Sequence, residues 1–161
     1  MNHTLAHRRS IAVGAWSLVV TGAGHGALVV VGSVTAPPVA EAEARRVMAA
    51  TEAVGLGLER SLSQLFLGFS VTMALLLVAF GVLNLLALRH APQLFLGTDT
   101  VLLLDLAVVM IALVISATLL PPPPIVLLAV ATAAFGAATG LRRPASAERE
   151  PTSRPAPAPV G

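Results

Sequence analysis

The 161-residue sequence contains no cysteine, no lysine and no tyrosine, and only 11 % of its residues are charged. Without cysteine, the chain has no disulfide framework, no thiolate nucleophile and no cysteine-ligated zinc or iron–sulfur site. Its ten positively charged residues are all arginine, and no aromatic residues are interleaved with them. A nucleic-acid-binding surface normally provides such aromatic stacking platforms, so we expect no nucleic-acid partner.

Motifs for catalysis and cofactor binding are also missing. The sequence has no glycine-rich phosphate loop and no nucleophile elbow. A haem held in a helical bundle usually takes two axial ligands at one depth, whereas His25 is the only histidine deep inside an apolar segment. We therefore expect no enzyme activity, no metal and no cofactor.

What the sequence has in abundance is apolar residues, at 56 % of the chain, more than a soluble protein of this size can bury. They form four segments, at residues 11–34, 65–88, 100–120 and 125–141. A helix needs about 20 apolar residues to cross the roughly 30 Å of hydrocarbon in a bilayer. Because backbone groups in lipid must be satisfied internally, the segments should be helices. The sequence predicts an all-α integral membrane four-helix up-down bundle, with the lipid bilayer as its surroundings.

Two of the connections between these segments carry structural information. Residues 121–124 are four consecutive prolines, which predict a tight reversal because proline cannot continue a helix. Residues 41–60 have apolar positions at helical spacing and an i,i+4 ion pair between Glu41 and Arg45. They predict an extra amphipathic helix between the first two spans, lying on the membrane or on the bundle.

The arginines predict how the membrane domain, residues 11–141, is oriented. Seven arginines lie on the side of the two termini and three on the opposite side. By the positive-inside rule, residues 1–10 and the proline-rich tail 142–161 should be cytoplasmic, and the tail should be disordered. Abundant alanine, glycine, proline and arginine without lysine are typical of a bacterial protein from a GC-rich genome, which indicates the bacterial inner membrane. One alternative is a cleaved N-terminal signal peptide, although the first apolar run is long for that role.

Ionisable residues inside spans are energetically costly and often mark functional sites. His25 and Asp105 are such residues here. Counting residues from the segment ends places His25 in one layer with Thr72 and Thr132, with Ser70 slightly further out. Thr21 lies one turn from His25 on the same helix face. The predicted intramembrane polar site therefore comprises Thr21, His25, Ser70, Thr72 and Thr132.

Asp105 belongs to a different layer, close to the cytoplasmic end of the third segment. Asn84 lies at a matching depth in the second segment, and Arg89 is close enough to pair with Asp105 at the interface. We expect these residues to form a structural tie. The offset between His25 and Asp105 is roughly 10 Å along the bundle axis, so a direct acid–base dyad is not expected.

Glycines spaced four residues apart allow helices to approach closely, and Gly22 with Gly26 and Gly136 with Gly140 have this spacing. In such an interface, His25 would be a neutral packing residue bonded to a neighbouring threonine. The other interpretation is that His25 binds a proton, ligand or substrate in the space beside the neighbouring glycines, which have no side chains.

The pattern G-x-G-H at residues 22–25 and G-F-S-x-x-M at residues 68–73, followed by Asn84-Leu85, resembles a group of small uncharacterised bacterial four-helix integral membrane proteins. The resemblance covers roughly residues 11–141. It implies the four-span architecture and points to seven positions: Gly22, Gly24, His25, Gly68, Phe69, Ser70 and Asn84. It implies no activity.

We therefore expect a non-enzymatic structural or accessory membrane subunit, forming a homo-oligomer or joining another membrane protein. The alternative is a small transporter or ligand-binding membrane protein with an intramembrane site around His25.

Overall fold

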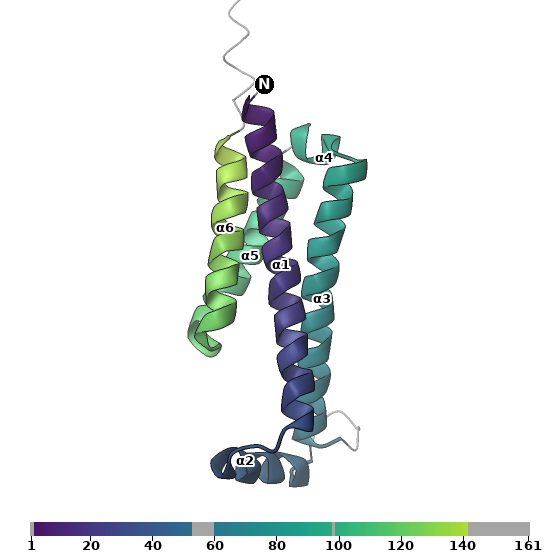
Figure 1. Ribbon diagram of the computed structural model, residues 1–161, viewed down its shortest axis with the longest axis vertical. Helices are drawn as coiled ribbons and strands as arrows, with labels where there is room; N and C mark the ends of the chain where they lie inside the picture. The colour runs from purple at the N-terminus through teal and green to yellow at the C-terminus, as the bar shows by residue number, and fades with distance from the viewer. Residues whose placement is uncertain (1, 53–59, 98, 142–161) are drawn as a thin grey trace, which may run out of the picture.

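A computed structural model describes residues 2–52, 60–97 and 99–141 (Figure 1). These residues form six helices and no strand: α1 (Asn2–Val34), α2 (Val39–Ala50), α3 (Leu62–His90), α4 (Gln93–Leu96), α5 (Thr100–Leu119) and α6 (Pro122–Gly140). Four of them, α1, α3, α5 and α6, are long and apolar enough to cross a membrane. The predicted all-α four-helix up-down membrane bundle is confirmed.

The four long helices form an incomplete ring in the order α3, α1, α6, α5. Helix α1 packs against α3 on one side and against α6 on the other, and α5 packs against α6. Within the described residues, the backbones of α3 and α5 do not come into contact along their lengths. They are linked at one end by the short helix α4 (Figure 1), which the sequence analysis did not predict.

The hydrophobic core fills the half of the bundle that is nearer to α4. Its buried residues come from all four long helices and from α4: Ile11, Leu18, Leu88, Phe95, Leu102, Val109, Leu128, Ala131, Phe135 and Ala138. Phe95 is fully buried and closes the α4 end of this core. Since Ile11 and Leu18 are core residues, α1 is an integral part of the bundle.

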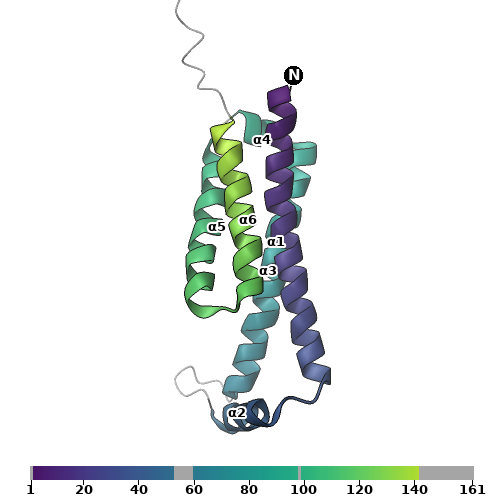
Figure 2. The same ribbon diagram turned by 60° about the vertical axis from the view of Figure 1, so that its left-hand side comes forward.

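Helices α5 and α6 are shorter than α1 and α3, and they stop well short of α2 (Figure 2). Gly14 lies against the ring of Phe135, and α6 begins about a dozen residues before Phe135. Because α6 runs antiparallel to α1, the α5–α6 turn lies about a dozen residues along α1 from Gly14, at about the level of Ala27. We call the part of the α1–α3 pair that continues beyond this turn, residues 27–34 and 62–72, the extension.

The bounds of the spans differ from the predicted ones by up to three residues, and by more at the start of α1. The chain reverses at Leu120 and Pro121, and α6 begins at Pro122 instead of residue 125. Prolines are accommodated here because the N–H groups of the first helical turn have no intrahelical partner. Helix α1 begins at Asn2 instead of residue 11, so the polar start of the chain continues the first span as helix.

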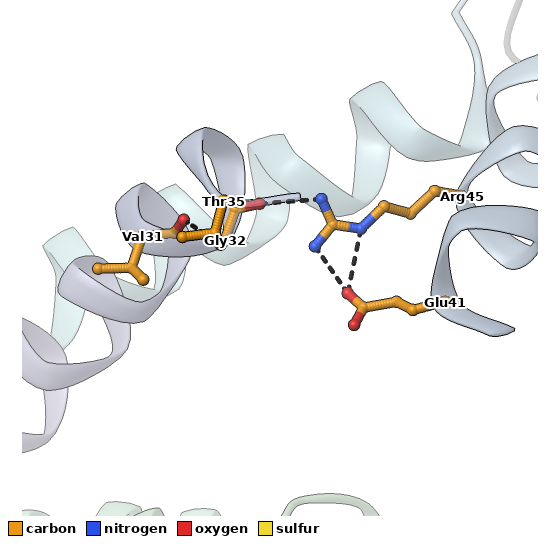
Figure 3. Close-up of polar contacts among 5 residues, drawn as sticks. All are labelled: Val31, Gly32, Thr35, Glu41 and Arg45. Atoms are coloured by element: carbon orange, nitrogen blue, oxygen red, sulfur yellow. Dashed lines mark hydrogen bonds and ion pairs between the residues drawn. The ribbon is translucent and has the colours of Figure 1, made fainter. Parts of the chain in front are cut away.

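Helix α2 lies across the end of the extension (Figure 1) and is shorter than predicted. The predicted segment 41–60 continues into residues 53–59, which lie outside the described residues. The expected pair between Glu41 and Arg45 is confirmed, with Arg45 Nη2 2.6 Å from Glu41 Oε1. Arg45 Nη1 also donates to the carbonyl oxygen of Gly32 at 2.9 Å (Figure 3). This carbonyl belongs to the last turn of α1, where intrahelical donors run out, so Arg45 caps α1 from α2.

Candidate intramembrane polar site

Three glycines bring α1 and α3 into close contact. A Cβ atom on Gly22 would lie 2.7 Å from the carbonyl oxygen of Ala74, and one on Gly81 would lie 2.6 Å from that of Ala15. A Cβ atom on Gly26 would lie 3.6 Å from the Cβ atom of Ala74. Gly81 was not among the predicted packing residues, although a glycine inside a long apolar helix costs about 1 kcal/mol relative to alanine and so is itself a signal of close packing.

The second glycine pair behaves differently. No atom lies within 4 Å of a Cβ placed on Gly136 or Gly140. These glycines do not hold α6 against another helix, so the expected contact at this pair is not made among the described residues.

His25 lies on α1 at the level of Ala74, just before the extension begins. Its side chain is half-buried, and its Nε2 atom is shielded from solvent without a hydrogen-bond partner among the described residues. Thr21, one turn away, is buried and donates its hydroxyl proton to the carbonyl oxygen of Ser17 at 2.7 Å. Thr21 is therefore satisfied within α1, and His25 is not.

The predicted layer is wrong for Thr132, whereas Thr72 does lie at about the level of His25 on the facing helix α3. Phe135 contacts Gly14, and Thr132 lies three residues from Phe135 in the direction of His25. Thr132 is therefore still about 12 Å from His25 along the bundle axis. Its hydroxyl donates to the carbonyl oxygen of Leu128 at 2.8 Å. The residue count misplaced Thr132 because it assumed that all spans end at the same two planes.

The other predicted partners of His25 lie on α3. Ser70 is half-buried and Thr72 is exposed. Neither residue shares a hydrogen bond with His25 in the described structure. The described residues around His25 thus leave its Nε2 atom without a hydrogen-bond partner.

The structure brings Asn84 and Asp105 together, as the depth count predicts. Both are buried, with 4 % and 3 % of their surfaces exposed, and Asn84 Nδ2 donates to Asp105 Oδ1 at 3.5 Å. This is a long hydrogen bond, and the same Nδ2 also donates to the carbonyl oxygen of Phe80 at 3.2 Å. The contact bridges α3 and α5 on the open side of the ring.

Arg89 does not join this pair. Its side chain is exposed, and the salt bridges of the described residues both lie within α2. Asp105 Oδ2 consequently has no hydrogen-bond partner in the described part of the chain.

His7 is a buried polar residue that the sequence analysis did not single out. Only 2 % of its surface is exposed, and its Nδ1 lies 3.0 Å from the carbonyl oxygen of Ala138. Because a carbonyl can only accept, Nδ1 carries the proton, while the buried Nε2 has no partner among the described residues. His7 lies four residues before the core residue Ile11, and this helical spacing is the signal that could have identified it.

These buried polar groups are distributed over the length of the molecule. His7 and His25 are separated by about 27 Å along α1, and no hydrogen bond joins either to Asp105. Among the described residues, no three side chains of the metal-binding types lie together. The arrangement therefore offers isolated hydrogen-bonding groups at several depths, of which His25 lies next to the uncovered extension.

Comparisons of the chain with protein-family models, curated proteins and solved structures found no match.

Proposed function

We propose that this protein is a non-enzymatic membrane subunit that acts by packing against another membrane protein chain through the extension. The observation that carries this proposal is the uncovered apolar surface of α1 and α3 beyond the α5–α6 turn. Leu28, Phe66 and Phe69 are exposed to 68 %, 67 % and 74 % there. Helix α2 covers only the end of this surface (Figure 2).

The chemistry of this region suits helix association. Helices in lipid associate through close packing of small residues and through hydrogen bonds across the interface. Gly24 and Gly68 are exposed, and a Cβ on either would meet no atom within 4 Å, so a partner helix can approach both backbones closely. His25 adds an imidazole nitrogen without a hydrogen-bond partner among the described residues, which a polar group on the incoming helix would satisfy.

Photo-crosslinking in cells tests this function. A photoreactive phenylalanine analogue would replace Phe69 in the extension, and the matched control would replace Ile111 on α5, which is also well exposed. We expect a discrete protein adduct from position 69 and only lipid adducts from position 111. Twice the mass of the chain would identify a second copy, and any other defined mass would identify a different subunit. Lipid adducts alone at both positions would contradict the proposal.

A second candidate function is the binding or transport of a small molecule at His25. The specific observation in its favour is the shielded Nε2 atom, with the open surface of Gly24 and the half-buried Ser70 nearby. A transport site must be reached by water, whereas a packing histidine is dry.

The native absence of cysteine allows a direct test of water access. His25→Cys would be treated in intact cells with a membrane-impermeant thiol reagent, alongside Thr51→Cys as an exposed control at the α2 end. Labelling at position 25 as fast as at position 51 would support a water-filled site. Protection of position 25 would favour the assembly function.

We further propose that the protein resides in the bacterial inner membrane with both termini in the cytoplasm. The support for this orientation is the arginine distribution in the sequence, with seven arginines on the side of the termini and three on the other.

A further inference from the structure

A groove of about 480 Å³ runs along the outer surface of the bundle between α1 and α6, away from the extension. Its lining includes Arg9, Ala12, Val13, Trp16 and Val20 from α1 and Leu127 from α6. The α1 residues recur at intervals of three and four, so they lie along one helix face. Ser17 also lines the groove but is buried, and apart from it and Arg9 the lining side chains are all apolar or predominantly so.

The shape of the groove follows from the size of its residues. Ala12 is half-buried and leaves a hollow, while Val13, Trp16 and Val20 are each about half exposed and stand around it. The distance along α1 from Arg9 to Val20 is roughly 16 Å, about half of the hydrocarbon thickness of a bilayer. The groove is therefore as long as one lipid leaflet is deep.

Charge is present at one end of the groove only. Arg9 is exposed, and the salt bridges of the described residues involve Arg45 and Arg46 instead. Arg9 lies at the end of the bundle where the apolar part of α1 begins, so its guanidinium is at the level of lipid headgroups. A guanidinium binds phosphate oxygens well because its N–H groups form a planar fork.

We propose that this groove binds one phospholipid with an anionic headgroup. The phosphate binds the Arg9 guanidinium, and one acyl chain lies along Val13 and Trp16 toward Leu127. A partner helix is a poorer fit, because the groove spans a single leaflet and has its cation at the polar end. This site is independent of the extension and of the assembly function proposed for it.

Trp16 provides the readout, since it is the only tryptophan in the chain and lines the groove. The full-length protein would be reconstituted in phosphatidylcholine vesicles in which a fixed minority of the lipid is either brominated phosphatidylglycerol or brominated phosphatidylcholine. Bromine quenches tryptophan on contact, so the ratio of the two quenching efficiencies at equal mole fraction measures the preference for the anionic lipid.

We expect brominated phosphatidylglycerol to quench Trp16 more strongly in the wild type. Arg9→Gln, a change at an exposed position, should lower this preference about fivefold, the contribution expected of one arginine at a membrane surface. The matched control is Arg89→Gln, which removes an exposed arginine near the same end of the bundle but outside the groove, and it should keep the preference. Ala12→Leu fills the hollow without changing charge and should also lower the preference.

Each alternative outcome overturns the proposal. Equal quenching by the two lipids in the wild type would show that the groove holds only unselected lipid. An unchanged preference in Arg9→Gln would remove the headgroup contact, and an unchanged preference in Ala12→Leu would show that charge acts without the groove. Loss of the preference on adding soluble glycerol phosphate would identify a site for the free anion instead of a lipid.

Discussion

Gly22 and Gly81 show how single residues determine the packing of this bundle. Each is placed where a Cβ atom would lie under 3 Å from the backbone of the facing helix. Two long helices can therefore approach each other without side chains between them, and their contact gains dispersion energy along its length.

Gly81→Ala should destabilise the protein by about 1–3 kcal/mol, because the added methyl group would force α1 and α3 apart. Gly68→Ala is the matched control on the same helix, where the space is open, and it should be neutral or stabilising by up to about 1 kcal/mol. Unfolding by denaturing detergent, followed by circular dichroism, would measure both. A neutral effect of Gly81→Ala would show that the close contact is absent.

At this scale the sequence predicted some contacts and not others, for one physical reason. Asn84 and Asp105 lie near span ends that are aligned at one side of the bundle, so counting residues from those ends brought them together. Thr132 was counted from the end at which the spans are not aligned, and its predicted contact with His25 does not exist. The sequence does not indicate which ends of helices of unequal length lie at the same level in the bundle.

At the scale of elements, α2 shows how an exposed helix can be held by a few polar contacts. None of its residues is buried, and Arg45 links it both to its own Glu41 and to the end of α1 (Figure 3). Its attachment to α1 therefore depends on hydrogen bonds of the kind that contribute only about 1 kcal/mol at a surface, while α2 also contacts α3.

Arg45→Ala should release α2 from α1 while leaving the bundle folded. We expect amide hydrogen exchange in α2 to become several-fold faster, with no change in the core helices, because a surface link of this kind contributes less than about 1 kcal/mol. Arg46→Ala is the control, since Arg46 pairs only with Glu43 within α2. Equal acceleration in both variants would mean that the link to Gly32 does not hold the helix.

Element boundaries were predictable where composition changes sharply and not elsewhere. The amphipathic segment and the four apolar runs gave the correct order of helices. The start of α6 within the prolines and the short helix α4 were missed, because a first helical turn tolerates proline and because four residues carry too little periodicity to be recognised.

On the scale of the whole molecule, α4 and α2 mark opposite ends of the bundle (Figure 1), so they should lie on opposite sides of the membrane. In intact cells, an impermeant thiol reagent should label Thr51→Cys, which follows α2. Gln93→Cys in α4 should react only after the membrane is opened, as the arginine distribution predicts. The reverse pattern would invert the proposed orientation, and labelling of both or of neither would contradict the up-down arrangement.

The α1–α3 pair is longer than the α5–α6 pair, and this difference has a consequence for the surrounding lipid. The apolar run of α1 that begins at Ile11 extends over about 36 Å, whereas α5 and α6 each extend over about 30 Å or less. One side of the protein is thus matched to a thicker bilayer than the other, a hydrophobic mismatch within a single chain. We expect the molecule to tilt or to impose a gradient of thickness on the bilayer, so that two copies with their long sides together share one thickened patch of membrane.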